Sequence, residues 1–269
     1  MSVVSMTSQS LSPADIPALA VEGLDKHFGA LHVTRGVSLK LDQGARHALI
    51  GPNGAGKTTI VGLLTGVIAP DAGSILLFGK EMVGRSAEAR VKAGLVRTFQ
   101  ITSLFRGLSV EENVFLAVSE RNGQSGDFFR AAGRRGDLLD ETRSILGQMR
   151  LEAFAGTLVQ DLAYGQQRLV EIALALALKP KVLLLDEPAA GIPSSESYLL
   201  LDALASLPAD IAIMMIEHDM SLVRRFATDV TVLVHGGVIL SGPLDQVMNA
   251  EEVQKAYLGS AAGKQGAHR

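Results

Sequence analysis

One short stretch constrains the fold of this chain more than any other. Residues 51–59 read GPNGAGKTT and match the pattern G-x-x-x-x-G-K-[ST]. The apolar run ARHALI (45–50) precedes this stretch, and the helix-like TIVGLLTG (59–66) overlaps its end. Because the pattern acts between a strand and a helix, the sequence predicts a strand–loop–helix unit within an α/β fold.

The residue types in this stretch point to phosphate binding. Glycines at this spacing let the chain curl until successive backbone N–H groups face an anion, and the next helix adds its positive end. Lys57 would reach the β- and γ-phosphates of a nucleotide, and the Thr58 hydroxyl would ligate Mg²⁺. We predict that this loop binds the nucleotide through Asn53, Gly54, Ala55, Gly56, Lys57, Thr58 and Thr59.

The composition of the chain excludes several classes of protein. With 269 residues, 47% of them hydrophobic, the chain is long enough for a packed core. Its net charge of −3 disfavours nucleic-acid partners, and the absence of cysteine rules out disulfides and thiolate metal sites. The longest apolar run, IALALALKPKVLLL, is broken by Lys179 and Pro180, so we predict no transmembrane segment. The N-terminus also lacks the basic start of a signal peptide.

The apolar patterns outside the loop predict both kinds of sheet. Residues 19–28 and 33–41 alternate as antiparallel strands do, and SILLF (74–78) predicts a further strand. The runs VLLLD (182–186) and IAIMMI (211–216) are typical of parallel strands covered on both faces. Residues 231–242 predict a hairpin that turns at Gly236-Gly237.

The middle of the chain has a different character. From about residue 100 to 165 helical patterns dominate, and Ser109 with Glu112 has the spacing of a capping box. The Gly-rich, basic stretch 121–137 predicts a surface loop. We predict a strand–helix core over residues 19–99 and 166–245, with a helical insert over residues 100–165. A poorly ordered N-terminal extension (1–18) precedes the core, and a C-terminal helix with a frayed tail (246–269) follows it.

Acidic, amide and imidazole side chains follow the predicted strands. Asp186 and Glu187 end the run KVLLLDEP, at the sheet edge where open α/β sheets bind ligands. Asp186 would hold Mg²⁺, and Glu187 would orient and deprotonate an attacking water; alternatively, the two residues cap the next helix. Gln100 would touch the metal or the water, and His218 would donate a hydrogen bond to the γ-phosphate. Each of these two residues is otherwise an ordinary loop residue.

Five motifs occur in a fixed order along the chain: GPNGAGKTT, RTFQ, LAYGQQ, LLLDEP and IEHD. Their kinds and order, over roughly residues 19–245, resemble the nucleotide-binding subunits of ABC transporters. RTFQITSLFRGLSVEENV, LAYGQQ and DEPAAG are most similar to the ATP-binding subunits of branched-chain amino acid importers. The resemblance implies a P-loop ABC-type ATPase with a mixed sheet core, N-terminal antiparallel strands and an inserted helical subdomain. It also implies ATP and Mg²⁺ as cofactors.

The resemblance assigns a role to LAYGQQ that the stretch alone does not reveal, since a Gly-containing helix start is common. In the family, two subunits pack head to tail, and this signature motif closes over the ATP held by the partner's phosphate loop. The corresponding ligand contacts here are Ala163, Tyr164, Gly165 and Gln166. The helix from about Gln166 onward would point its positive end at the γ-phosphate.

This chain departs from the family pattern at three positions. Ala163 and Tyr164 stand where the commonest signature has Ser and Gly, so a hydroxyl contact to phosphate is missing. Pro193 stands where the family often has an Asp that contacts the partner. Phe28 matches the aromatic residue that stacks on adenine; alternatively, it is a core residue at a strand end.

The resemblance also implies partners and a location. The expected function is ATP hydrolysis that drives amino acid uptake, at the cytoplasmic face of the inner membrane. The expected partners are membrane permease subunits, a second ATPase subunit (paralogue or self) and, indirectly, a substrate-binding protein. Ile101, Leu104, Phe105 and Leu108 form either a permease-docking surface or a satellite core of the helical insert. Alternative functions are transport of urea or a lipid, a soluble non-transport ABC ATPase, and a degenerate cassette that only binds nucleotide.

Overall fold

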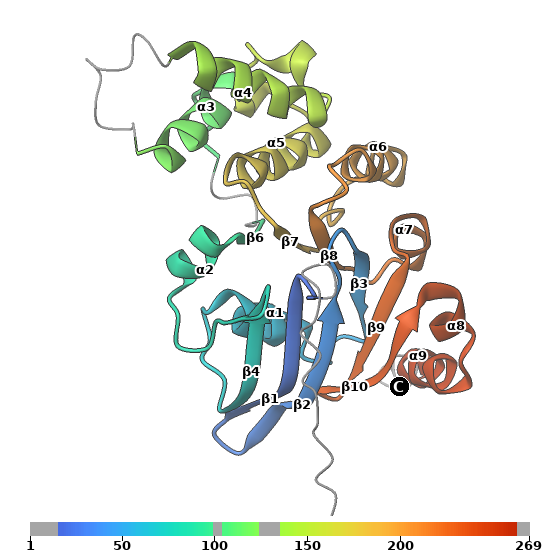
Figure 1. The fold of residues 1–269 in the computed structure, drawn as a ribbon. Helices are drawn as coiled ribbons and strands as arrows, with labels where there is room; N and C mark the ends of the chain where they lie inside the picture. Colours follow the sequence, from blue (N-terminus) through green and yellow to red (C-terminus); the bar gives the residue numbers. More distant parts are fainter. Residues whose placement is uncertain (1–15, 99–103, 124–134, 263–269) are drawn as a thin grey trace, which may run out of the picture.

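The computed structural model describes residues 16–98, 104–123 and 135–262. Within them the chain forms two sheets and a set of helices (Figure 1). The predicted residues Gln100 and Ile101 lie outside the described residues, as do most of the N-terminal extension, part of the 121–137 loop and the end of the tail. The boundaries that we predict between subdomains therefore remain a proposal.

The larger sheet has six strands in the order β10-β9-β3-β8-β7-β6. All neighbouring pairs are parallel except β10 with β9. The prediction of buried parallel strands for VLLLD and IAIMMI is confirmed. The strands of this sheet are β3 (Arg46–Ile50), β6 (Leu95–Arg97), β7 (Val182–Asp186), β8 (Ala212–Ile216), β9 (Asp229–Val234) and β10 (Gly237–Pro243).

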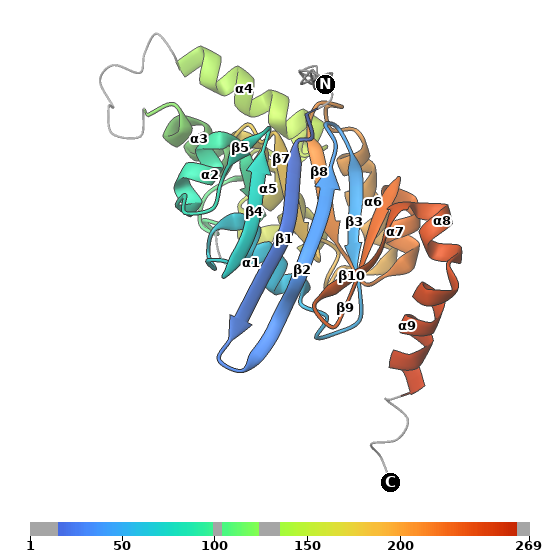
Figure 2. The ribbon, with the colours of Figure 1, turned by 60° about the horizontal axis from the view of Figure 1, so that its bottom comes forward.

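The smaller sheet is antiparallel and is built from the N-terminal part of the chain. Its order is β2-β1-β4-β5, and the long strands β1, β2 and β4 lie side by side in Figure 2. The prediction of N-terminal antiparallel strands is confirmed. Its strands are β1 (Leu19–Phe28), β2 (Leu31–Leu41), β4 (Ala72–Leu77) and β5 (Lys80–Glu81).

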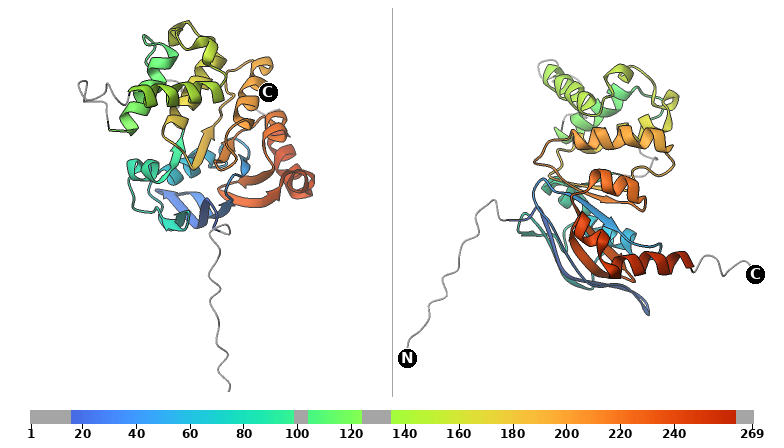
Figure 3. Two further views of the ribbon diagram at one scale, coloured as in Figure 1. Left: turned by 45° about the horizontal axis from the view of Figure 1, so that its top comes forward. Right: turned by 90° about the vertical axis from the view of Figure 1, so that its right-hand side faces the viewer.

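Helices surround the larger sheet and also extend beyond it. Helices α3, α4 and α5 pack on one another at one end of the molecule, with α6 against α5 (Figures 1 and 3). The predicted capping box begins α3: the Ser109 N–H donates to the Glu112 carboxylate (2.7 Å), and the Glu112 N–H donates to Ser109 Oγ (3.2 Å). The α-helices are α1 (Lys57–Thr65), α2 (Ala87–Ala93), α3 (Val110–Arg121), α4 (Arg135–Gln148), α5 (Tyr164–Ala177), α6 (Ser194–Ala205), α7 (Met220–Phe226), α8 (Leu244–Asn249) and α9 (Glu251–Ala262), and two 3₁₀ turns span Glu152–Phe154 and Val159–Asp161.

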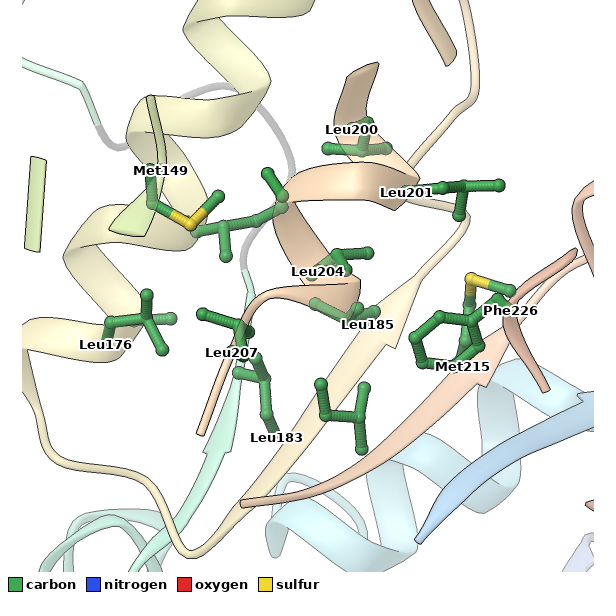
Figure 4. Packing of buried hydrophobic residues seen from close by; sticks show 14 of the residues in the cluster. Met149, Leu176, Leu183, Leu185, Leu200, Leu201, Leu204, Leu207, Met215 and Phe226 are labelled. Carbon is green, nitrogen blue, oxygen red and sulfur yellow. The ribbon is translucent and has the colours of Figure 1, made fainter. Parts of the chain in front are cut away.

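Strand β7 shows why a strand in the middle of this sheet is a continuous apolar run. Successive side chains of a strand point to opposite faces. Leu183 and Leu185 enter the cluster under α4, α5 and α6 (Figure 4), whereas Val182 and Leu184 enter the cluster shared with α1 and the antiparallel sheet. All four are fully buried. Since both faces of β7 are covered, its one polar residue, Asp186, stands where the strand ends, and the site is built there.

The C-terminal hairpin turns one residue earlier than predicted. Gly237 pairs with Val234, so the two-residue turn is His235-Gly236 rather than Gly236-Gly237. Both turn residues have positive φ, 48° for His235 and 83° for Gly236. A two-residue hairpin turn that matches strand twist takes this geometry. The prediction failed because it assigned the positive φ to the two glycines and not to the histidine.

Candidate active site

The phosphate loop connects β3 to α1 and has room only for glycine at two of its positions. A Cβ atom on Gly51 would lie 2.1 Å from the Leu233 carbonyl oxygen, a distance that no packing tolerates. Gly56 has φ 102°, and a Cβ there would lie 3.0 Å from the Val33 carbonyl oxygen. Strands β9 and β2 therefore pack directly against the loop. This packing keeps the loop backbone in the curled conformation that an anion site requires.

Lys57 begins α1 and turns back over the loop. Its ammonium donates to the carbonyl oxygens of Gly51 (2.7 Å) and Pro52 (3.2 Å), and the residue is buried. Burial lowers the pKa of the Lys57 amine, while the negative charges of Glu187 and Asp186 act in the opposite direction. The amine therefore lies within the electrostatic reach of both carboxylates that the sequence placed at the strand edge.

The other loop residues divide between the surface and the core. Asn53, Gly54 and Thr58 are exposed, Gly56 and Thr59 are half-buried, and Ala55 is buried. The Ala55 carbonyl accepts a hydrogen bond from the Gly236 N–H (3.0 Å), so the hairpin turn supports the loop. The exposed residue Thr58 carries a hydroxyl, and Asp186 carries a carboxylate near Lys57. Both groups are hard oxygen donors, the kind that Mg²⁺ prefers. This donor set fits the metal.

The acidic edge lies where β7 and β8 end. Asp186 is the last residue of β7, with only 10% of its side chain exposed, whereas 41% of the Glu187 side chain is exposed. Glu187 has φ 46°, and its N–H donates to the Ile216 carbonyl of β8 (2.9 Å). Non-glycine residues with such backbone angles concentrate at functional sites. His218 Nδ1 lies 3.7 Å from Glu187 Oε1. The structure thus brings Lys57, Asp186, Glu187 and His218 together.

Sequence reasoning missed two charged residues at this edge. Arg97, the last residue of β6, donates to Asp186 Oδ2 over 2.7 Å. Glu217 is buried and accepts hydrogen bonds from the N–H groups of Ala189 and His218, both 3.2 Å. Burial raises the pKa of Glu217, and these hydrogen bonds oppose that shift. Both residues stand at the end of an apolar strand, as Asp186 and His218 do. That position in the sequence could have identified Arg97 and Glu217 as site residues.

The signature residues form the first turn of α5. This helix begins at Tyr164, two residues before the predicted start. The Gln166 side chain accepts from the Ala163 N–H (3.0 Å), and Ala163 has no side-chain oxygen to return the bond. The first N–H groups of a helix have no acceptor within it. The start of α5 therefore offers donors to an external anion.

Two contacts tie the signature turn to the segment that follows β7. A Cβ on Gly191, which has φ 77°, would lie 3.3 Å from the Tyr164 ring. A Cβ on Gly165 would lie 2.8 Å from Glu196 Oε2 and 3.6 Å from the Ile192 side chain. The ring of Tyr164 thus occupies space that the missing side chain of Gly191 leaves open. Pro193, the third departure from the family pattern, is the N-cap of α6.

The remaining predicted residues lie at the surface or just below it. Phe28 ends β1 with 49% of its surface exposed, and Lys26 lies 5.6 Å above its ring. It is not a core residue, so its ring is accessible for stacking. In the predicted docking stretch, Phe105 is 61% exposed but Leu104 is buried in the larger core cluster. Of the two alternatives for this stretch, the structure therefore favours a core role for Leu104, because this side chain packs inward.

Comparison with known proteins identifies the family. The profile described as "ABC transporter" matches residues 34–190. This chain belongs to the ABC transporter family. It is 37% identical over 252 residues to the high-affinity branched-chain amino acid transport ATP-binding protein BraF of Pseudomonas aeruginosa, and 38% identical to LivG of Salmonella typhimurium, which has the same description. Each alignment covers 91% of this chain and 99% of the relative.

Solved structures of ABC cassettes have the same fold. A nucleotide-free ATP-binding cassette superposes with a TM-score of 0.77 at 25% identity, and a cassette in its ADP conformation with 0.78 at 26%. Both comparisons cover 90% of this chain and at least 98% of the other. The predicted fold, a P-loop ABC-type ATPase with a mixed sheet core, is confirmed. In the described ranges of this chain, no helix is long and apolar enough to cross a membrane.

Proposed function

We propose that this chain is the ATP-hydrolysing subunit of an importer for branched-chain amino acids. The observation that carries the proposal is the meeting of Lys57, Asp186, Glu187 and His218 at one sheet edge. Relatives that align over 99% of their length are described as ATP-binding proteins for branched-chain amino acid transport. This intact set of groups argues against a degenerate cassette that only binds nucleotide.

The residues divide the work of hydrolysis among them. The loop amides and Lys57 bind the β- and γ-phosphates, Phe28 stacks on adenine, and Thr58, Asp186 and Gln100 hold Mg²⁺, which supplies charge neutralisation when bound. Glu187 accepts a proton as water attacks the γ-phosphorus, while the bond to the β-phosphate oxygen breaks and ADP leaves. His218 donates a hydrogen bond to the γ-phosphate, within reach of Glu187.

The second half of the site comes from another subunit in this proposal. Ala163, Tyr164, Gly165 and Gln166 close over ATP held by the partner's phosphate loop, and α5 points its positive end at the γ-phosphate. ATP that binds the closed dimer more tightly than the separate subunits shifts the equilibrium toward closure, and hydrolysis reopens the dimer. A permease at the cytoplasmic face of the inner membrane receives that motion through the helical region, where the exposed Phe105 is available for contact.

The proposal is tested in the source cell. Deletion of the gene is expected to reduce uptake of labelled leucine, isoleucine and valine, and the wild-type gene is expected to restore it while Glu187→Gln does not. Labelled ribose and urea serve as cargo controls. Loss of ribose or urea uptake alone would reassign the cargo. A protein that sediments with ribosomes and not with membranes would favour the non-transport alternative.

A further inference from the structure

Among the described residues, Arg97 and Glu171 are the charged ones that line a small cavity between the sheet edge and the helical region. The cavity has a volume of about 190 Å³, and the described residues that line it are Arg97, Thr98, Ala117, Glu171, Leu174, Ala175 and Leu178. Arg97 ends β6, whereas Glu171 lies on α5, the helix that begins with the signature residues. The cavity therefore joins the metal edge of the site to the signature helix.

In each of the two side chains, one polar atom has a hydrogen-bond partner and another buried polar atom has none. Arg97 Nη2 donates to Asp186 (2.7 Å), but its Nε is buried without a hydrogen-bond partner. Glu171 Oε2 accepts from Arg168 (2.9 Å), but its Oε1 is buried without one. A buried donor and a buried acceptor that are both unpaired each carry a desolvation penalty, which a direct bond between them would remove.

The charges around Glu171 favour a second cation. The residue is only 7% exposed, and burial raises the pKa of its carboxyl in spite of the opposing effect of Arg168. Arg168 is itself shared, because its guanidinium also lies over the Tyr164 ring at 5.5 Å. One guanidinium thus compensates the Glu171 carboxylate incompletely, and the Arg97 guanidinium is the cation that borders the same cavity.

We propose that Arg97 is a positioning residue with two partners: Asp186 before Mg²⁺ binds, and Glu171 afterwards. The proposal rests on the proposed function, in which Asp186 is a Mg²⁺ ligand. A dication and a guanidinium compete for one carboxylate, since each repels the other at short range. When Asp186 turns to the metal, Arg97 loses its partner, and the cavity gives its side chain room to reach Glu171 Oε1. The binding of metal and nucleotide is thereby transmitted to α5, the helix whose first turn carries the signature.

The test compares ATP affinity with and without Mg²⁺ in the full chain carrying Glu187→Gln, which prevents turnover. The readout is the Mg²⁺ gain, defined as the dissociation constant of ATP in EDTA divided by that in Mg²⁺. Glu171→Gln removes the second partner of Arg97, so we expect it to reduce the Mg²⁺ gain about tenfold, equivalent to about 1.4 kcal/mol. In a chain that already carries Arg97→Gln, Glu171→Gln is expected to leave the Mg²⁺ gain unchanged. Equal reductions in both backgrounds, or no reduction in either, would overturn the proposal.

A matched control separates this effect from general loss of an ion pair. Arg121 and Glu141 form another partly buried pair, with contacts of 2.9 and 2.6 Å, and do not line the cavity. Glu141→Gln is expected to leave the Mg²⁺ gain unchanged. A parent protein without any Mg²⁺ gain would instead count against the proposed function, because the metal assignment itself would fail.

A second measurement is made on the wild-type chain, and a variant serves only to assign the signal. The side-chain Nε–H resonance of Arg97 is followed by NMR in the wild-type chain and assigned with Arg97→Lys. We expect it to shift when Mg²⁺ and ADP are added together, and not with ADP in EDTA, since Nε gains an acceptor only in the first case. An unchanged resonance under saturating Mg²⁺ and ADP would contradict the two-partner arrangement.

Discussion

The phosphate loop and the start of α5 both present backbone N–H groups at the beginning of a helix, yet they are built very differently. At the loop, the Leu233 and Val33 carbonyls leave no room for side chains on Gly51 and Gly56, and Lys57 adds a buried charge. At α5, a Cβ on Gly165 would lie 2.8 Å from the Glu196 carboxylate, and Ala163 contributes no side-chain oxygen.

This difference indicates which site binds alone. The loop has a cation, a hydroxyl and shaped backbone, so it can hold phosphate within one chain. The first turn of α5 has no lysine and no serine or threonine hydroxyl, and Gly165 lies next to a carboxylate, so an anion would bind there only when other groups hold it in place. In Figure 1, α1 lies among the sheets and α5 lies in the helical region at the other end. The two half-sites therefore suit a ligand shared between two subunits.

The largest expected effect comes from Glu187, which lies beside the phosphate loop, the half-site that can bind phosphate within one chain. Glu187→Gln keeps the side-chain shape but removes the proton acceptor, and general-base contributions are about 10²–10⁴-fold. We expect turnover of MgATP to fall by that factor, measured as phosphate release, with ATP affinity retained. Undiminished turnover would remove Glu187 from its proposed role.

Lys57→Ala is expected to weaken nucleotide binding in the monomer itself. The substitution removes charge-assisted hydrogen bonds to phosphate, each contributing about 1.5–3 kcal/mol, so ATP affinity should fall about tenfold to a hundredfold by calorimetry. Lys92→Ala is the control, since Lys92 forms an exposed pair with Glu88 on α2. Equal ATP affinity in the Lys57 variant and the control would mean that the loop is not complete within one chain.

Gly165→Ala tests the start of α5, the half-site that needs a second subunit to bind ATP. The added Cβ meets the flexible end of Glu196, which can move, so the fold and monomer ATP affinity should be retained. Because the methyl group blocks close approach of a phosphate to the helix start, ATP-dependent dimerisation in the Glu187→Gln background should weaken roughly tenfold to a hundredfold, measured by light scattering.

The control for this prediction is Gly156→Ala, where a Cβ meets nothing within 4 Å. A chain that binds ATP but stays monomeric without either substitution would indicate that a paralogous subunit normally supplies the second half-site. Weakened ATP binding by the Gly165→Ala monomer would contradict the division into two half-sites.

How far the sequence predicted the site depends on how local each interaction is. GPNGAGKTT was readable because its strand, loop and helix are consecutive, and Asp186 and His218 were readable because polar residues end apolar strands. The pairing of Arg97 with Asp186 joins two strands 89 positions apart in the chain, and the Tyr164–Gly191 contact joins a helix to a loop. No periodicity encodes such contacts. The role of Leu104 stayed open between surface and core for the same reason, since a short apolar stretch does not show which side chain packs inward.

Ala163→Ser has the smallest expected effect and sharpens the comparison most. Half of a capping box is present, because the Gln166 side chain already accepts from the Ala163 N–H; a serine hydroxyl would accept from the Gln166 N–H and complete it. The N-cap should stabilise the chain by about 1 kcal/mol, which raises Tm by roughly 2–4 °C. In Gln166→Leu the other half is absent, so the gain from serine should be smaller there.

The serine hydroxyl would also supply the contact to phosphate that the commonest family signature has and that Ala163 lacks. Turnover of the Ala163→Ser variant should therefore rise if the start of α5 contacts ATP, whereas higher Tm with unchanged turnover would mean that this turn only caps a helix.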